Sequence, residues 1–333
     1  MKFSVGYQPD ELFRQSVLRH ADAVRELYFP WGGFSTGRGV SAGSAFQRKL
    51  EEDLTAYSAA GLSMNWLLNG NCYGRYAQSR AFFQRVGDGA DELKARFGLR
   101  SVTTASPLIA RFLKNNFPEL EIRASVNMET GTPEAVEYLL PWFDSFYLKR
   151  EYNYDFARLK RMREFTRARG KKLFLLANSG CLNFCSARTF HDNLVAHQHE
   201  IAEMDNALDF HGVCHLFLKD GEHGRNLLSH TNFIRPEDVA RFEPWCDGMK
   251  LATRTSRNPS LIVEAYASGF AHGNLLDLTE PAHAGHFHPN ILLSGRIPAD
   301  WLERRWRCGK TCESCGWCAE IQARATVSLN PEF

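Results

Sequence analysis

The stretch KKLFLLANSGCLNFCSARTFHDN, which spans residues 171–193, shows most directly how this chain folds. It opens with the apolar run Lys172 to Ala177, which is typical of a buried strand. The run leads directly into a polar segment that carries Cys181 and Cys185, and a polar helix start follows. A strand, a loop and a helix in this order indicate a βα unit.

Apolar runs of this kind recur along the whole chain, with longer amphipathic stretches between them. The predicted strands are Lys2 to Tyr7, Val24 to Pro30, Leu62 to Leu68, Ser101 to Thr104, Glu121 to Val126, Ser145 to Leu148, Lys172 to Ala177 and Gly248 to Ala252. The helical patterns include Ser44 to Ala60, Pro107 to Asn116, Pro133 to Leu140, Asp155 to Arg169 and Arg235 to Phe242. Strands and crossover helices in this number favour a TIM-like (β/α)8 barrel. An open doubly wound sheet is the alternative, but no GxGxxG follows the first strand to support dinucleotide binding.

The length of 333 residues and the hydrophobic content of 44% allow one large barrel with a small appendage, or two ordinary domains. We assign residues 1–271 to the barrel and residues 272–333 to a cysteine-rich C-terminal extension. The formal net charge is only +2, so it does not support a nucleic-acid partner, although it does not rule one out. We expect a cytoplasmic protein that does not enter a membrane, because no signal peptide or long apolar run is evident.

Polar side chains follow the predicted strands, where the active sites of barrels form. Each of them taken alone could be an ordinary solvated loop residue. They are Asn69, Asn71, Glu129, Lys149, Arg150, Glu151, Asn178 and Arg254. Arginine and lysine at one rim could bind a carboxylate or phosphate, while asparagine and glutamate could orient or deprotonate a substrate.

The chain has nine cysteines, which is consistent with a reducing compartment where thiols remain available as metal ligands. In the barrel, Cys181 and Cys185 follow a strand and form the first candidate ligand pair. Cys214 is the third candidate, and either Cys246 or Cys72 would complete the set. The alternative is that these thiols are small buried hydrophobic residues.

Four further cysteines stand within eleven positions of the tail, as CxxxCxxCxxC: Cys308, Cys312, Cys315 and Cys318. Thiols at this density can surround an iron–sulfur cluster. Zinc sites more often show two CxxC pairs separated by a longer loop, and unliganded thiols are a further alternative. Nearby, Arg304, Arg305 and Arg307 are expected to be solvated helix residues, although they could contact an acidic partner.

The segment LLANSGCLNFCSARTFHDN resembles the signature of peptidase family U-32, in which an Asn-x-Gly-Cys strand end is followed by Cys, Arg and His. The segment IRPEDVARFEPWCDGMKLATRT is similar to the family's Ile-x-Pro-Glu-Asp helix and to the following strand that carries lysine and arginine, here Lys250 and Arg254. The resemblance implies a TIM-like barrel that holds a 4Fe-4S cluster. It also implies an activity among those known for the family, which include oxygen-independent hydroxylases of ubiquinone precursors, transfer RNA and ribosomal RNA. The tight CxxxC and the additional tail leave open whether one or two clusters are bound.

Arg188 and His191 lie one turn apart after the CxxxC, so a helix there would present both at the barrel mouth. Arg188 suits an anionic substrate and His191 suits proton transfer, a role for which Glu129 is also a candidate. The predicted substrate-binding residues are Asn69, Lys149, Asn178, Arg188, Lys250 and Arg254.

These features predict an iron–sulfur redox enzyme that hydroxylates a small anionic or aromatic molecule without oxygen, supplied with electrons by a donor or partner protein. The alternatives are a non-catalytic cluster-carrying subunit that docks onto a partner enzyme, and a peptidase. The chain has neither an HExxH motif nor an evident nucleophile–histidine pair, so the peptidase ranks last.

Overall fold

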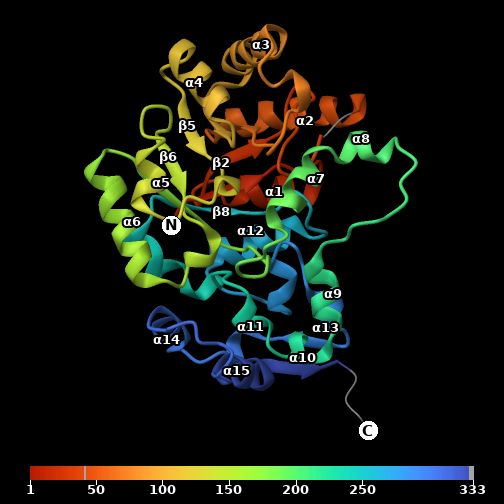
Figure 1. Cartoon of the computed structure of the whole chain (residues 1–333), viewed down its shortest axis with the longest axis vertical. Helices are drawn as coiled ribbons and strands as arrows, with labels where there is room; N and C mark the ends of the chain where they lie inside the picture. The colour runs from red at the N-terminus through yellow and green to blue at the C-terminus, as the bar shows by residue number, and fades with distance from the viewer. Residues whose placement is uncertain (41–42, 330–333) are drawn as a thin grey trace.

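The computed structural model describes residues 1–40 and 43–329, and a closed parallel barrel forms its centre (Figure 1). Its strands follow one another in chain order, and β8 closes the barrel against β1. They are β1 (Phe3–Gly6), β2 (Val24–Phe29), β3 (Ser63–Leu68), β4 (Leu99–Thr104), β5 (Glu121–Ala124), β6 (Ser145–Tyr147), β7 (Lys172–Leu176) and β8 (Gly248–Leu251). The predicted TIM-like barrel is therefore confirmed, and each predicted strand overlaps an observed one.

Helices between the strands cover the outside of the barrel. They are α1 (Glu11–Arg19), α2 (Ser44–Ala59), α3 (Arg80–Phe97), α4 (Pro107–Asn116), α5 (Pro133–Glu137), α6 (Phe156–Ala168) and, after β8, α12 (Pro259–Ser268). Side-chain caps fix several starts, since Ser79, Ser106 and Asp155 each accept a hydrogen bond from a backbone N–H three residues further on. The predicted helix Arg235 to Phe242 is instead the 3-10 helix η4 (Pro236–Trp245), which contains Pro244. Proline has no N–H to donate, so a regular α-helix is disfavoured there.

A polar layer fills part of the barrel interior. The Arg123 side chain is fully buried, and its guanidinium forms ion pairs with Glu26 and Glu121. Arg123 also lies 4.1 Å above the ring centre of Phe174. Buried charges are tolerated only when they are paired, and this layer meets that condition.

The connection from β7 to β8 is longer than a single crossover helix. It contains the short helices α7 (Arg188–Ala196), α8 (Gln198–Ala202), α9 (Val213–Lys219), α10 (Gly221–Gly224) and α11 (Leu227–His230). Figure 1 shows the segment between α8 and α9 projecting away from the barrel. This insertion places additional residues over the end of the barrel at which β7 finishes.

The C-terminal part lies beside this insertion, below the barrel in Figure 1. Strands β9 (Asn290–Leu292) and β10 (Thr326–Ser328) form an antiparallel pair, and helices α14 (Trp301–Trp306) and α15 (Trp317–Ala325) lie between them in sequence. The remaining short helices are η1 (Gly74–Tyr76), η2 (Val126–Met128), η3 (Arg150–Tyr152), η5 (Leu275–Leu278), α13 (Ala284–Phe287) and η6 (Ser294–Arg296).

Arg305 joins the C-terminal part to the insertion. Its guanidinium donates hydrogen bonds to the backbone oxygens of Leu228 at 2.6 Å and Thr231 at 3.0 Å, and to the side-chain oxygen of Asn232 at 2.7 Å. The prediction that Arg305 is solvated was wrong, because only 2% of the residue is exposed. Its donors satisfy backbone carbonyls that would otherwise be buried without partners.

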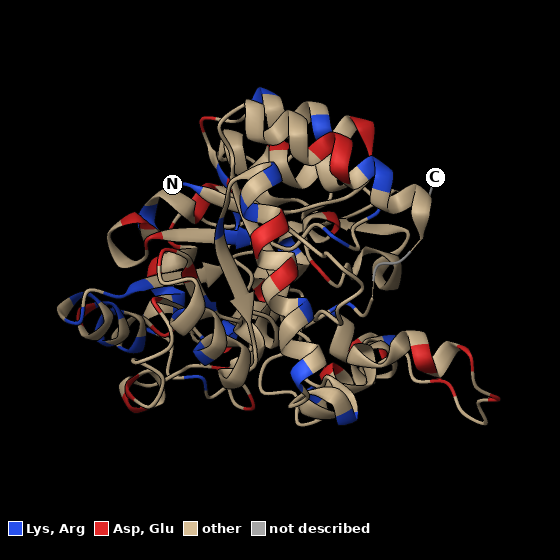
Figure 2. Ribbon diagram, turned by 90° about the horizontal axis from the view of Figure 1, so that it is seen from above, with Lys and Arg blue, Asp and Glu red and all other residues tan. Residues whose placement is uncertain are grey.

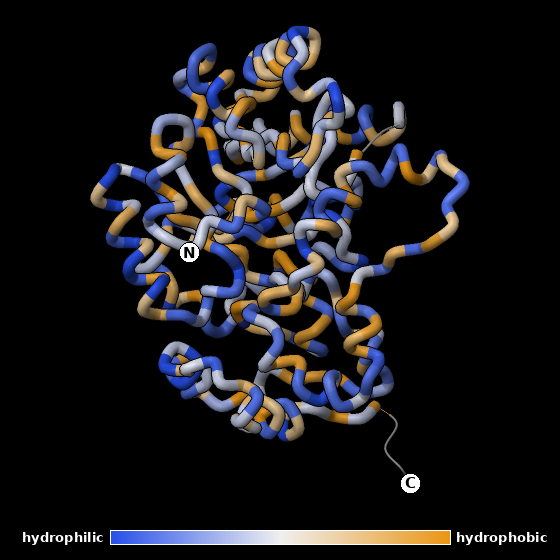
Figure 3. The backbone as a smooth tube through the Cα atoms, viewed as in Figure 1, coloured by the Kyte–Doolittle hydropathy of each residue, from blue (hydrophilic) through white to orange (hydrophobic). Residues whose placement is uncertain are grey.

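Charged residues of both signs are interspersed over the ribbon in Figure 2, which agrees with the small net charge. In Figure 3, hydrophobic positions recur along the central strands and alternate with hydrophilic ones on the outer helices. Among the described helices, none is both long and apolar enough to cross a lipid bilayer.

Candidate active site

A cavity of about 330 Å³ opens at the carboxyl ends of the barrel strands, beneath α7 and the start of α9. Four segments supply its cationic side chains: the loop after β2, the loop after β6, the start of α7, and β8 with the loop after it. These cationic residues are Arg38, Arg150, Arg188, Lys250 and Arg254. The acidic residues on its wall are Asp192 and Glu280, so the lining carries more positive than negative groups. An anion is therefore the favoured occupant.

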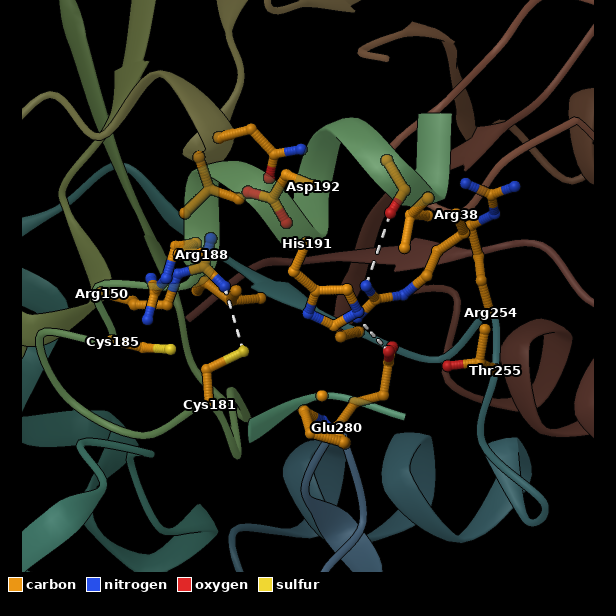
Figure 4. Close-up of a pocket in the computed structure, with 18 of the residues that line it drawn as sticks. Arg38, Arg150, Cys181, Cys185, Arg188, His191, Asp192, Arg254, Thr255 and Glu280 are labelled. Atoms are coloured by element: carbon orange, nitrogen blue, oxygen red, sulfur yellow. Dashed lines mark hydrogen bonds and ion pairs between the residues drawn. The ribbon is translucent and has the colours of Figure 1, made fainter. Parts of the chain in front are cut away.

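Arg38 and Glu280 form an ion pair across the cavity wall (Figure 4). Burial raises the pKa of Glu280, but the charge of Arg38 and hydrogen bonds outweigh this and hold the pKa below its ordinary value. Glu280 in turn raises the pKa of Arg38 against the effect of burial. Both groups are therefore charged, and the pair fixes the Arg38 side chain at the rim.

Arg254 packs against β1 and β2 at the same rim. Its Nη1 donates a hydrogen bond to the Thr36 hydroxyl at 3.0 Å. A Cβ atom at Gly6 would lie 2.6 Å from Arg254 Cγ and 2.5 Å from the ring of Tyr28, so only glycine fits between them. The missing side chain at Gly6 thus lets Arg254 and Tyr28 approach each other at the cavity.

Lys250 reaches the cavity from the inner face of β8. Its Nζ lies 4.1 Å from the ring centre of Tyr28 and 5.7 Å from that of Tyr147. Burial lowers the pKa of Lys250 to about 7, and the positive charges of Arg254 and Arg38 add to this effect. The amine is therefore much less basic than an exposed lysine.

Three thiols from two segments meet at this cavity: Cys181 and Cys185 follow β7, and Cys214 lies at the start of α9. Arg150 Nη1 donates a hydrogen bond to Cys181 Sγ at 3.3 Å. Burial raises the pKa of the Cys214 thiol, and the nearby Cys181 adds to the effect. Figure 4 shows Cys181 and Cys185 on the same side of the cavity. The structure thus brings together three of the predicted ligands.

His191 lies next to this thiol group. A Cβ atom at Gly212, where φ is +88°, would lie 3.4 Å from Cys214 Sγ and 3.9 Å from His191 Cε1. Gly212 therefore allows the chain to turn between the thiol and the imidazole. Burial lowers the pKa of His191, so the ring is neutral at neutral pH and able to accept a proton.

Cys246 lies elsewhere. Cys246 directly precedes β8, so it lies at the amino end of the parallel barrel. The cavity lies at the opposite end, where the strands finish. Burial raises its pKa to about 12, and the thiol donates to the backbone oxygen of Phe242 at 3.6 Å. We therefore remove Cys246 from the ligand set and describe it as a core residue.

Cys72, the other candidate for a fourth ligand, follows β3 but does not line the cavity. The Gly74 backbone N–H donates a hydrogen bond to Cys72 Sγ at 3.4 Å, and this bond, together with the nearby imidazole of His197, lowers the pKa of Cys72. The interaction with Cys72 raises the pKa of His197, whose Nδ1 lies 3.2 Å from Glu200 Oε2. Cys72 and His197 are far apart in the sequence. No local sequence motif predicts that they lie close together.

Glu129 and Lys149 pair with each other beside the cavity, with 3.1 Å between Lys149 Nζ and Glu129 Oε2. Arg188 joins the group, 3.4 Å from Glu129 and 2.9 Å from the buried Glu151. Neither Glu129 nor Lys149 lines the cavity, whereas Arg188 does. The geometry favours His191 over Glu129 for proton transfer, because Lys149 and Arg188 already form ion pairs with the Glu129 carboxylate.

The two predicted asparagines differ in position. Asn69 lines the cavity and accepts a hydrogen bond from the Gly37 N–H at 3.1 Å. Asn178 is fully buried, accepts from the Ala252 N–H at 2.6 Å, and donates to the carbonyls of Ala252 and Leu278 at 2.8 Å each. Asn178 thus ties β7 to the segments around it and does not line the cavity.

The tail cysteines Cys308, Cys312, Cys315 and Cys318 line a separate cavity of about 570 Å³ between α14 and α15. Arg305 donates to Cys318 Sγ at 3.4 Å, and the Lys310 N–H donates to Cys308 Sγ at 3.4 Å. Burial lowers the pKa of Lys310 to about 8. Four thiols with nearby donors suit an iron–sulfur cluster, since hydrogen bonds to the sulfurs stabilise its negative charge.

Among residues 1–40 and 43–329, no three His, Cys, Asp or Glu side chains converge as ligands of one metal ion. The sulfurs that hold a four-iron cluster bind different iron atoms, so they need not converge on one point.

Fold and site together define a (β/α)8 barrel protein with a cation-rich mouth that carries three thiols. No family model matches the chain. The chain is 26% identical over 272 residues to the uncharacterized protease MJ1657 of Methanocaldococcus jannaschii, a match that covers 78% of this chain and 76% of that protein. The solved structure of the U32 peptidase Mk0906 is similar in fold, and the match covers 76% of this chain and 92% of the Mk0906 chain. The sequence identity over this match is 15% and the TM-score is 0.56. The chain is thus similar in sequence to a protein named as a protease and in fold to a U32 peptidase, which agrees with the resemblance of its sequence motif.

Proposed function

We propose that this protein is an iron–sulfur enzyme that binds a small anion at the barrel mouth and carries out redox chemistry on it, with oxygen-independent hydroxylation as the reaction. The observation that carries the proposal is that Cys181, Cys185 and Cys214 share one cavity with arginine and lysine side chains. The choice of hydroxylation rests on the family resemblance. A cluster held by three protein thiolates keeps an iron position open for substrate.

The surrounding residues have separate tasks in this proposal. Arg38 and Arg254 bind the acidic group of the substrate, because their guanidinium groups lie at the rim and carboxylates pair well with such groups. His191 accepts or returns a proton, because burial keeps its ring neutral. Arg150 holds Cys181 in place by its hydrogen bond.

The tail thiols would hold a second cluster, which would pass electrons from a donor protein. Cys308 and Cys315 are exposed, so a redox partner can approach this group. A non-catalytic cluster carrier would also explain the thiols. It would not explain why a cavity of about 330 Å³ is lined by cationic side chains, and this favours the enzyme.

The test is metal and sulfide analysis of anaerobically purified protein. We expect about eight irons per chain for two 4Fe-4S clusters. The triple variant Cys181→Ala, Cys185→Ala, Cys214→Ala should retain about half of the iron, and a variant that lacks the four tail thiols should retain the other half. Full iron retention by the triple variant, or zinc in place of iron after anaerobic reconstitution, would contradict the proposal.

Peptide hydrolysis is the second candidate, because the two similar proteins are named as a protease and a peptidase. The structural observation that favours it is the pairing of Cys72 with His197, which Glu200 approaches. A thiol, an imidazole and a carboxylate in this order resemble a nucleophile with its base and orienting group. Loss of peptide cleavage in Cys72→Ala, with cleavage retained in Cys181→Ala, would favour hydrolysis over redox chemistry.

A further inference from the structure

Lys250 lies at the inner wall of the cavity without an acidic partner. Only 8% of the residue is exposed, and its Nζ faces the rings of Tyr28 and Tyr147. Within the described part of the chain, Nζ forms no ion pair and no hydrogen bond. Structural lysines in protein interiors are normally paired, so this position calls for another explanation.

The charges around Lys250 explain why its amine can be neutral. Arg254, Arg38 and Arg123 act on it with positive charge, and Glu280 is the opposing carboxylate. Glu280 is already paired with Arg38. Burial, more than these charges, lowers the pKa of Lys250 to about 7, so a large fraction of the amine is unprotonated near neutral pH. An unprotonated amine in a buried site is a nucleophile toward carbonyl carbon.

We propose that Lys250 forms an imine with the carbonyl carbon of a small 2-oxo acid bound in the barrel mouth. The carboxylate of such a molecule would pair with Arg254 and Arg38, which lie on the same cavity wall as Lys250. The rings of Tyr28 and Tyr147 would flank the new C–N bond and shield it from water. The cavity volume of about 330 Å³ limits the ligand to a small molecule.

The step balances without an oxidant or reductant. The lone pair of Lys250 Nζ forms a bond to the carbonyl carbon, and the carbonyl π pair moves to oxygen. A proton passes from nitrogen to this oxygen and gives a carbinolamine. The lone pair on nitrogen then forms the C=N bond as the C–O bond breaks, and the departing hydroxide takes the remaining N–H proton and leaves as water. This inference goes beyond the proposed function, because it requires no cluster.

The experiment traps the imine in the full-length, anaerobically purified protein. Glyoxylate is the probe, sodium cyanoborohydride reduces the imine, and peptide mapping by mass spectrometry locates the adduct. The matched internal control is Lys114, which is partly exposed and held by Asp144 at 2.7 Å. We expect Lys250 to be modified at least about tenfold faster than Lys114 at pH 7.5. About three pKa units raise the fraction of free amine by several hundredfold over that of an ordinary lysine, and the lower basicity and the burial of the Lys250 amine offset part of this gain.

Acetaldehyde serves as the second probe because it has a carbonyl but no carboxylate. We expect it to label Lys250 about tenfold more slowly than glyoxylate does, which is the effect of losing one charged hydrogen bond. Lys250→Arg should abolish the adduct, because arginine keeps the positive charge but is not a nucleophile. Equal labelling of Lys250 and Lys114 in the wild-type protein would overturn the proposal whether or not the variant folds.

Repeating the trapping in the Cys181→Ala variant separates this inference from the proposed function. We expect the Lys250 adduct to persist there even if redox activity is lost. A wild-type protein that contains iron but shows no preference for Lys250 would disprove the imine and leave the iron–sulfur proposal standing.

Discussion

Arg150 Nη1 lies 3.3 Å from Cys181 Sγ and donates a hydrogen bond to it, so the segment after β6 is tied to the thiol that follows β7. Arg150 Nη2 is also buried and has no hydrogen-bond partner among the described residues. One guanidinium can therefore serve both the sulfur and a bound anion. This relationship connects the thiol group to the cationic part of the cavity.

Replacing Arg150 by alanine should make the cluster that we propose at the barrel thiols harder to reduce. A hydrogen bond and a positive charge beside a sulfur both stabilise the reduced state, and this variant removes both. We expect a more negative midpoint potential for one of two clusters in a redox titration followed by electron paramagnetic resonance. Arg150→Lys is the control and should show a smaller shift, since it keeps the charge. Identical potentials in Arg150→Ala and the wild type would argue against a cluster at Cys181.

Cys246→Ala should leave the iron content unchanged. The thiol packs in the core at the amino end of β8, so its loss creates a small cavity that costs about 1 kcal/mol in the free energy of unfolding. Iron analysis and urea denaturation of the same preparation check both parts. A large loss of iron would return Cys246 to the ligand set, and Cys181→Ala is the comparison in which loss is expected.

Arg38→Ala should leave Glu280 as a buried carboxylate without its main partner. Such a loss costs about 3–5 kcal/mol in the free energy of unfolding at pH 8. In the variant the pKa of Glu280 rises above its unfolded value, so the folded state binds more protons than the unfolded one, and stability falls as the pH rises. The deficit relative to the wild type should therefore shrink toward pH 5.

The double variant Arg38→Ala, Glu280→Gln is the control for this pair. It removes the unpaired charge and should recover most of the lost stability at pH 8 in urea denaturation. A double variant as unstable as Arg38→Ala would show that the deficit does not arise from the charge of Glu280.

Lys250→Met should be more stable than the wild type near pH 7. The pKa of Lys250 is lowered to about 7 in the folded state, so between pH 7 and the ordinary lysine pKa the unfolded state binds more protons. The contribution of Lys250 to the free energy of unfolding of the wild type therefore increases with pH, by roughly 1.4 kcal/mol per pH unit at most. The advantage of the variant should shrink from pH 7 to pH 9 in urea denaturation. A pH-independent difference would contradict the lowered pKa.

Asn178→Ala should destabilise the fold, because it leaves buried groups of Ala252 and Leu278 without their hydrogen bonds. We expect a loss of about 2–4 kcal/mol in the free energy of unfolding. Asn69→Ala is the contrasting variant: it should alter anion binding more than stability, since Asn69 lines the cavity. Wild-type stability in Asn178→Ala would contradict this assignment.

Local patterns predicted the barrel well. The apolar runs gave every barrel strand, and the position of Cys181 and Cys185 directly after β7 placed them at the mouth. A residue that follows a parallel strand lies at the mouth, and a residue that precedes one lies at the other end of the barrel. Cys246 precedes β8, so this rule places it at the end opposite the mouth. The sequence left Cys246 open as a ligand or as a small core residue, and barrel topology excludes it from the mouth.

Other parts of the site depend on contacts between distant segments. Arg38 and Glu280 stand 242 positions apart, and nothing local to either residue signals their ion pair. The depressed pKa of Lys250 likewise depends on burial and on neighbours from other strands. Arg305 looked like a surface residue because its neighbours are charged, yet carbonyls of the insertion surround it. Such features follow from the assembled fold and have no short sequence signature.

The central claim, a cluster on Cys181, Cys185 and Cys214, is tested most directly in a variant in which the four tail cysteines are serine. Electron paramagnetic resonance of this protein, reconstituted and reduced under anaerobic conditions, should show a cluster signal that disappears when Cys181→Ala is added. The shape of this cluster signal should change when a small carboxylate binds in the cavity that the three thiols line. A tail variant that folds but binds no iron would contradict the account.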